Sequence, residues 1–213
     1  MYKRQVVNGT TVTVTPPAPN TTSDDIVRTM TVSVAGGNSR EVTLTQFAAG
    51  SGGDTKGIYT SMSQFIPAST STTDRYYPSN STIDGQPATG FKLGTSSLAG
   101  VFTSEALGAS LTGDKKLSFY AVAWTGKAAT VYIRVNNGGA VSGDGSHAIT
   151  ASAGATGSGN DFTFTDVTDS DYYTFQLTGL TAASTVTIST SPDFTAASDR
   201  NTGRAIVLGV QVY

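Results

Sequence analysis

The stretch that decides the fold class is Lys116-Leu117-Ser118-Phe119-Tyr120-Ala121-Val122-Ala123-Trp124. Every second residue from position 117 to position 123 is apolar, as listed here: Leu117, Phe119, Ala121 and Ala123. Such a period of two indicates a β-strand with one buried and one wetted face. The segment 130–135 repeats the pattern, with Val131, Ile133 and Val135 on one side. Both segments therefore predict strands.

Similar short runs continue from residue 91 to the end of the chain, separated by clusters of Gly, Ser, Asn and Asp, with no convincing helix. Further strands are expected at residues 90–97, 100–104, about 148–151, 162–165, 172–177, 185–190 and 205–213. Many strands without crossover helices indicate an antiparallel sandwich or barrel. Eight to ten strands over roughly 150 residues is the size of a jelly roll. We expect an all-β fold.

The composition agrees with this expectation and narrows the partners. Of the 213 residues, 38% are hydrophobic and only 13% are charged, and Ser, Thr and Gly fill the difference. Threonine suits the solvated face of a strand because its branched Cβ favours extended backbone. The net charge of −2 provides no electrostatic footprint for nucleic acid or an anionic membrane. We expect neither nucleic-acid binding nor membrane insertion.

The chain contains no cysteine, which excludes a disulfide framework and a zinc–thiolate site. No apolar run approaches the roughly 20 residues of a membrane span. The first residues, Met1-Tyr2-Lys3-Arg4-Gln5, match a translated sequencing adapter, so we expect a fragment whose natural start and signal peptide are missing. The alternative is a natural basic N-terminus.

The first segment, up to residue 48, contains strand patterns at residues 11–15, 28–34 and 40–46, with a proline-rich stretch at 16–23 and a Gly36-Gly37-Asn38 turn. Three features stand out: Asn20-Thr21, Arg28-Thr29-Met30-Thr31-Val32 and Thr45-Gln46. Over about 40 residues this pattern resembles the C-terminal half of a BACON domain, an immunoglobulin-like sandwich of surface and secreted proteins in gut Bacteroidetes. The resemblance implies a truncated module, because the family's early strands have no counterpart here.

Residues 49–56 read as a short Gly/Ser linker, and residues 57–213 as a second domain. The stretches 92–107, 117–124, 169–175 and 204–213 resemble jelly-roll modules at the C-termini of large Bacteroidetes surface proteins. Those modules are similar in pattern to galactose-binding-like carbohydrate-binding domains. The resemblance implies a sandwich fold and a glycan ligand, and it assigns no ligand residue.

Aromatic side chains are the first candidates for ligand binding, because the C–H face of a sugar ring stacks on a flat π-surface. Tyr120 and Trp124 lie on the face opposite Phe119, and Tyr132 and Arg134 share the outer face of the next strand. If the two strands pair, these four residues form one patch. The alternative is that Tyr120 and Trp124 face the core.

A second candidate is the polar stretch 67–78, read as a loop, in which Tyr76 and Tyr77 follow Asp74 and Arg75. A loop with aromatic and polar side chains at a sandwich edge is typical of a binding site. The alternative is a loop anchored by one tyrosine. Arg204, at the start of the last strand, is expected to bind carbonyls, a carboxylate or a ligand.

Acidic residues gather at Asp161, Asp166, Asp169 and Asp171, and Asp144 lies in a Gly/Ser turn. Calcium takes oxygen ligands of this kind, but their spacing does not match an EF-hand, and aspartate commonly caps turns. No cofactor is expected, with a structural calcium ion left open.

Catalytic patterns are lacking in the sequence. His147 is the only histidine and no Gly-x-Ser-x-Gly motif accompanies it. Glu41 and Glu105 are the only glutamates and fall in different predicted domains, so no carboxylate pair for glycoside hydrolysis is marked. We expect a non-catalytic carbohydrate-binding module of an extracellular or cell-surface bacterial protein, acting within a longer chain. The alternative is a structural spacer or adhesion module.

Overall fold

A computed structural model describes residues 3–6, 12–15, 26–33, 39–46, 59–124, 128–149, 155–165, 172–196 and 203–213. Within these ranges the protein is almost entirely β-structure, with two three-residue 3₁₀ turns, η1 (Ser63–Phe65) and η2 (Ala109–Leu111). The predicted all-β class is confirmed. The chain divides into two compact units, residues 1–55 and 56–213. The linker expected at residues 49–56 lies outside the described residues.

The first unit contains two antiparallel ribbons. Strand β1 (Lys3–Val6) pairs with β2 (Val12–Thr15), and β3 (Ile26–Ser33) pairs with β4 (Ser39–Gln46). The strands expected near residues 11–15, 28–34 and 40–46 are therefore present, while the turn at residues 36–38 and the proline-rich stretch lie outside the described part. The immunoglobulin-like sandwich stays a prediction for this unit.

The second unit contains twelve named strands among the described residues. They are β5 (Tyr76–Ile83), β6 (Gln86–Leu93), β7 (Val101–Thr103), β8 (Gly113–Ala123), β9 (Ala129–Asn136), β10 (Ala140–Ser142), β11 (Ser146–Ile149), β12 (Thr156–Ser158), β13 (Asp161–Phe164), β14 (Tyr172–Leu180), β15 (Thr185–Ser189) and β16 (Ala205–Val212). They form an eight-stranded sheet in the order β10-β14-β8-β16-β6-β5-β13-β12 and a four-stranded sheet in the order β11-β9-β15-β7.

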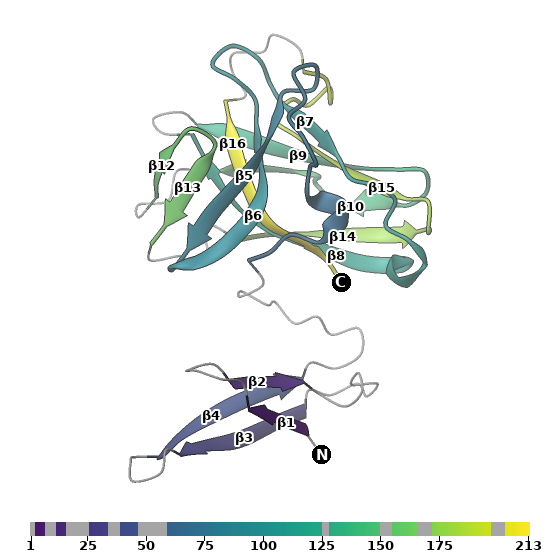
Figure 1. The fold of residues 1–213 in the computed structure, drawn as a ribbon. Coiled ribbons are helices and arrows are strands. Elements are labelled where there is room, and N and C mark those ends of the chain that lie inside the picture. The colour runs from purple at the N-terminus through teal and green to yellow at the C-terminus, as the bar shows by residue number, and fades with distance from the viewer. Residues whose placement is uncertain are drawn as a thin grey trace. The chain divides into compact units, whose positions relative to one another are not determined.

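The strand order is that of a jelly roll (Figure 1). Four strands, β6-β16-β8-β14, form the centre of the large sheet and face the four strands β7-β15-β9-β11 of the small sheet. Along the chain, successive members of this set of eight lie in opposite sheets, except for β9 and β11, which pair with each other. Strands β5 and β10 extend the large sheet at its two ends, and the β12–β13 hairpin continues beyond β5.

The inner core lies between the two sheets. The alternating apolar residues of β8, from Leu117 to Ala123, all belong to it, and Val131 and Ile133 of β9 meet them from the small sheet. The aromatic rings pack across the sandwich, as in the stacked pair Phe91 and Phe102 at 4.2 Å between centroids. The period of two in the sequence thus identified the inner face correctly.

Part of the outer face of the large sheet is also buried, over β5, β6, β16 and the second half of β8, which the alternation did not indicate. A second apolar cluster forms there, with members Ile83, Ala88, Tyr120, Val122, Phe162, Phe164, Ile206 and Leu208. In a flat sheet, β13 would lie about 19 Å from β8, four strand spacings away. Yet Phe162 of β13 packs edge-on against Trp124 at the end of β8, with ring centroids 5.4 Å apart. The sheet therefore curls, and the β12–β13 hairpin covers its own outer face.

Strand β5 occupies residues that the sequence analysis read partly as a loop. The prediction of a loop up to residue 78 was wrong at its end, because Tyr76 and Tyr77 open β5 and pair with Leu93 and Lys92. The turn into β6 consists of Asp84 and Gly85, both with positive φ (49° and 76°). An Asp-Gly pair with this geometry is a strong signal for a two-residue hairpin, and it was overlooked.

The segment before η1 completes the cover of the outer face. The hydroxyl of Ser61 donates to the carbonyl of Thr89 on β6 at 2.6 Å and accepts from the backbone N–H of Val210 on β16 at 3.1 Å. The contact with Val210 lies where the register of β16 against β8 shifts, between Leu208 and Gln211, and where Gly209 has a φ of 62°. Tyr59 then places its ring 6.0 Å from that of Tyr120.

The burial of the hairpin gives a test of the curled sheet. Phe164 is fully buried in the outer cluster, so Phe164→Ala is expected to lower the free energy of unfolding by about 3–5 kcal/mol. The matched control Thr163→Ala, on the exposed side of the same strand, is expected to cost about 1 kcal/mol or less. Urea unfolding of both variants measures the difference. Equal effects would contradict the covering role of the hairpin.

Candidate functional site

One end of the curled sheet gathers five polar and aromatic side chains, which we name the Trp124 cluster: Tyr77, Lys92, Trp124, Asn160 and Arg204. Tyr77 is paired with Lys92, and Lys92 with Ile206. Ile206 is in turn paired with Val122. Arg204 lies two residues before Ile206 and Trp124 two residues after Val122, and the backbone N–H of Trp124 donates to the Arg204 carbonyl at 2.9 Å. Because side chains repeat their face at every second position, four neighbouring strands direct these residues to the same face.

The contacts inside the cluster bring two cations to one indole ring. The Lys92 Nζ lies 4.7 Å from the centroid of the Trp124 ring, and the Arg204 Cζ lies 4.6 Å from it. The same Lys92 Nζ is 5.0 Å from the centroid of the Tyr77 ring and donates to the Asn160 Oδ1 at 2.9 Å. Asn160 lies in the turn between β12 and β13, so the covering hairpin contributes directly to the cluster. All five residues are half-buried.

The two charged side chains of the cluster, Lys92 and Arg204, are both cations. Burial lowers the pKa of Lys92, and the nearby Arg204 charge lowers it further. Burial also lowers the pKa of Arg204. Over the described ranges, neither side chain forms an ion pair with a carboxylate. Arginine keeps its charge at all ordinary pH values, so the described part of the site is positively charged and partly shielded from water.

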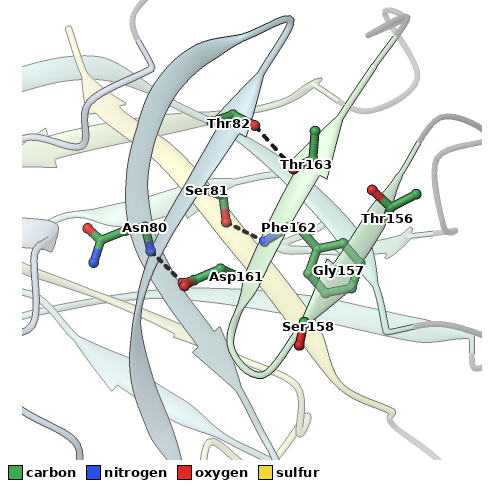
Figure 2. A pocket seen from close by; sticks show the side chains of 9 residues that line it. All are labelled: Asn80, Ser81, Thr82, Thr156, Gly157, Ser158, Asp161, Phe162 and Thr163. Carbon is green, nitrogen blue, oxygen red and sulfur yellow. Dashed lines mark hydrogen bonds between the residues drawn. The ribbon is translucent and has the colours of Figure 1, made fainter.

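A polar depression of about 620 Å³ lies beside the cluster on the same hairpin. Three strands line it with three residues each, Asn80–Thr82 of β5, Thr156–Ser158 of β12 and Asp161–Thr163 of β13. Figure 2 shows hydroxyl and carboxylate groups along its walls, where the Asn80 N–H donates to the Asp161 Oδ1 at 2.8 Å. Phe162 connects the depression to the Trp124 cluster, because it lines the depression and its ring contacts Trp124.

Tyr120 lies on the face predicted for it but is not available to a ligand. Its side chain is 1% exposed, and its ring packs 4.8 Å from that of Tyr172 and 6.0 Å from that of Tyr59. Burial raises the pKa of the Tyr120 hydroxyl, and its neighbours Tyr59, Tyr172 and Asp84 add to the increase. The expectation of an exposed ring was wrong because the curled sheet has a second core.

Tyr132 and Arg134 do not join Tyr120 and Trp124. The premise that their strands pair was wrong, because β9 pairs with β11 and β15 in the small sheet while β8 pairs with β14 and β16 in the large one. Tyr132 is half-buried opposite Ser189, and the Arg134 Cζ lies 4.4 Å from the centroid of the Phe194 ring. The four-residue patch therefore does not form.

The four candidate binding residues at positions 74–77 do not form one site in the structure. Tyr77 joins the Trp124 cluster, whereas the Tyr76 ring faces the inner core, edge-on to Phe102 at 5.2 Å. Asp74 is exposed, and its carboxylate accepts from the Ser71 hydroxyl at 3.1 Å within a local turn. Arg75 holds a positive φ of 59°, and its Nε is buried without a hydrogen-bond partner.

The acidic residues that raised the calcium question are only partly described. Asp144 accepts from the Ser146 N–H at 2.9 Å and the Ser146 hydroxyl at 2.8 Å, which is a turn-capping role and lowers its pKa. Asp161 accepts from Asn80, and Asp166, Asp169 and Asp171 lie outside the described residues. In the part that the structure describes, no three His, Cys, Asp or Glu residues gather as a metal site.

His147, the only histidine of the chain, lies in strand β11. Its ring packs edge-on against Tyr173 with centroids 4.6 Å apart, and its Nδ1 lies 2.8 Å from the Ala148 carbonyl oxygen. The side chain thus serves packing at the sandwich edge.

Three members of the predicted set, Tyr77, Trp124 and Arg204, come together, and sequence reasoning missed their partners Lys92 and Asn160. The alternation in Phe91-Lys92-Leu93 places Lys92 on the outer face and was the available signal. Asn160 had no such signal, because its position depends on the hairpin folding over four strands.

No family model, curated protein or solved structure matches this chain. The resemblances to BACON domains and galactose-binding-like modules therefore stay predictions, and the fold class rests on the strand order itself. Within the described ranges, no helix is both long and apolar enough to span a membrane.

The burial of Tyr120 predicts a pH effect on stability. The unfolded chain ionises this hydroxyl near its ordinary pKa of about 10, whereas the folded protein resists ionisation. Its contribution is therefore fully present below about pH 10 and is lost as the pH rises above that value. By about pH 11 the wild type should lose on the order of 1 kcal/mol that the Tyr120→Phe variant does not lose. Urea unfolding of both proteins at several alkaline pH values measures this difference in stability. Equal losses of stability in the wild type and in Tyr120→Phe would contradict the burial of the hydroxyl.

Proposed function

We propose that this chain is a non-catalytic carbohydrate-binding module of a secreted or cell-surface bacterial protein. The observation that supports the proposal best is the Trp124 cluster, in which the one tryptophan of the chain, a tyrosine, two cations and an amide converge from four strands and a hairpin turn. The adjacent polar depression adds hydroxyl groups along the same hairpin.

The chemistry of these groups suits a sugar. Indole and phenol rings offer π-surfaces to sugar C–H groups, and amide, ammonium and guanidinium groups bind hydroxyls or carboxylates. Half-buried side chains held by strand pairing need little reordering on binding, which lowers the entropic cost. A single shallow site of this kind gives weak binding, and neighbouring modules of a longer chain would supply avidity.

The two resemblances support the same assignment. A BACON-like first unit followed by a jelly-roll module with a galactose-binding-like pattern corresponds to surface glycan-binding proteins of Bacteroidetes. The proposal accordingly places the protein outside the cell, with glycans or polysaccharides and the other domains of its parent chain as partners. Ligand binding by Tyr132, Arg134, Tyr76 or Asp74 is not part of this site, because each lies apart from the Trp124 cluster.

One observation favours a second candidate function, that of a structural spacer or adhesion module. Across the described ranges every Tyr and Trp side chain is half-buried or buried, so no fully exposed aromatic platform is present there. Tyr120 and Trp124 also pack against the covering hairpin. A spacer needs those contacts for stability alone and would bind no glycan.

Affinity electrophoresis of the full chain through gels that contain neutral or acidic polysaccharides separates the two functions. We expect retardation by at least one polysaccharide, and Trp124→Ala should weaken it about tenfold or more because the ring supplies the stacking surface. Running each gel with calcium and with a chelator also tests the calcium question.

The matched control is Arg134→Ala, which removes an exposed residue of the other sheet that also contacts an aromatic ring. It should leave the retardation unchanged. Because Trp124→Ala removes half-buried packing, thermal unfolding must first show that the variant is folded. Retardation by no polysaccharide, or retardation that a folded Trp124→Ala variant retains, would refute the assignment.

A further inference from the structure

Within the described ranges, the two cations of the Trp124 cluster have no carboxylate partner, which half-buried cations normally have. Lys92 and Arg204 lie on adjacent strands, both within 5 Å of the centroid of one indole ring. The only hydrogen bond that the Lys92 ammonium forms there is to the neutral amide of Asn160. Charged groups withdrawn from water are usually paired or bound to an anion, so this arrangement is incomplete within the described residues.

Among the described residues, no carboxylate supplies the missing negative charge. Burial lowers the pKa of Lys92, and the charged group that lowers it further is another cation, Arg204. Asp161 is the carboxylate nearest along the hairpin, and it is engaged at 2.8 Å by the Asn80 N–H. The aromatic rings of Tyr77 and Trp124 stabilise the cations only through their π-faces. In the described part of the chain, N–H donors of both side chains therefore remain for a ligand.

We propose that the site selects acidic polysaccharides, with Lys92 and Arg204 binding a carboxylate or sulfate group of the sugar while Trp124 contacts the ring. This inference rests on the proposed carbohydrate-binding function and names its ligand class. Arginine presents a planar fork of donors that matches a carboxylate or sulfate, and lysine adds a point charge beside it. Asn160 holds the ammonium in place through its side-chain oxygen.

Selectivity for a charged sugar differs from general attraction to polyanions. The whole chain carries a net charge of −2, so its overall field repels anions. Only a ligand that reaches the cluster and stacks there gains from the local positive charge. A linear polyanion without a sugar ring, such as polyglutamate, is therefore expected to bind much more weakly than an acidic polysaccharide.

The experiment compares ligands that differ only in charge. The full chain is run through affinity gels with polygalacturonate and with the same polymer methyl-esterified, which removes the carboxylate charge. A second pair, sulfated and unsulfated galactan, tests the sulfate group. We expect at least tenfold stronger retardation by the charged member of one pair, which also identifies the anionic group, and little retardation by polyglutamate.

The variants Lys92→Gln and Arg204→Gln remove the charges and keep much of the side-chain volume. Each is expected to weaken binding of the acidic polymer about tenfold and to leave binding of the neutral polymer little changed. The control Lys115→Gln removes a cation at the far end of β8, about 30 Å from Trp124, and should have no effect. Thermal unfolding confirms that every variant compared is folded.

The outcomes separate this inference from the function on which it rests. Retardation by no polysaccharide overturns both. Retardation by neutral and charged polymers alike, lost in Trp124→Ala but retained in Lys92→Gln and Arg204→Gln, overturns the selectivity and keeps the carbohydrate-binding function. Equal retardation by polyglutamate, with an equal loss in Lys115→Gln, would also overturn it, because the binding would then be unspecific charge attraction.

Discussion

The curl of the large sheet over its own outer face is the constraint on which the rest of the second unit depends. Phe162 and Phe164 of the β12–β13 hairpin pack onto Tyr120, Val122, Ile206 and Leu208, so β16 and the second half of β8 are buried on both sides. In an ordinary sandwich the outer face meets water, and Tyr120 would be a natural ligand platform. Here the hairpin takes that surface into a second core. The Trp124 cluster, whose side chains are half-buried, lies beside the turn of this hairpin.

The same constraint explains the chemistry of the cluster. Strand pairing places Lys92 and Arg204 on the face that the hairpin covers, and the turn of the hairpin brings Asn160 to Lys92. Both cations are thereby partly withdrawn from water, which lowers their pKa values, while Trp124 and Tyr77 lie against them. A jelly-roll fold does not specify a function, because the same fold can carry many different sites. Two cations that form no ion pair within the described residues, together with aromatic rings, are the basis for proposing an acidic sugar as the ligand.

Much of the fold could be predicted from the sequence, because alternation reports local strand geometry. Leu117, Phe119 and the alanines after them identified the inner face of β8, and nine strands of the second unit overlap the ranges expected for them, with β6 and β11 beginning earlier than expected. Alternation cannot report which strands become neighbours, so the pairing of β8 with β9 was wrong. It also cannot show what covers an outer face, so the burial of Tyr120 was missed. Strand β5 was detectable from Asp84-Gly85. Three site residues were identified as aromatic or basic side chains, whereas Asn160 depends on tertiary folding.

Trp124 is the only tryptophan in the chain, so its fluorescence reports on the proposed site without any label. The most direct measurement is its emission during titration of the full chain with a purified galacturonate oligosaccharide. The account predicts a saturable change in emission at the concentrations at which calorimetry detects binding, because the sugar contacts the ring and displaces water from Lys92 and Arg204. Calorimetric binding with an unchanged emission spectrum would place the ligand elsewhere on the molecule. The absence of any binding would leave the Trp124 cluster as a purely structural contact of the covering hairpin, and either result would contradict the account.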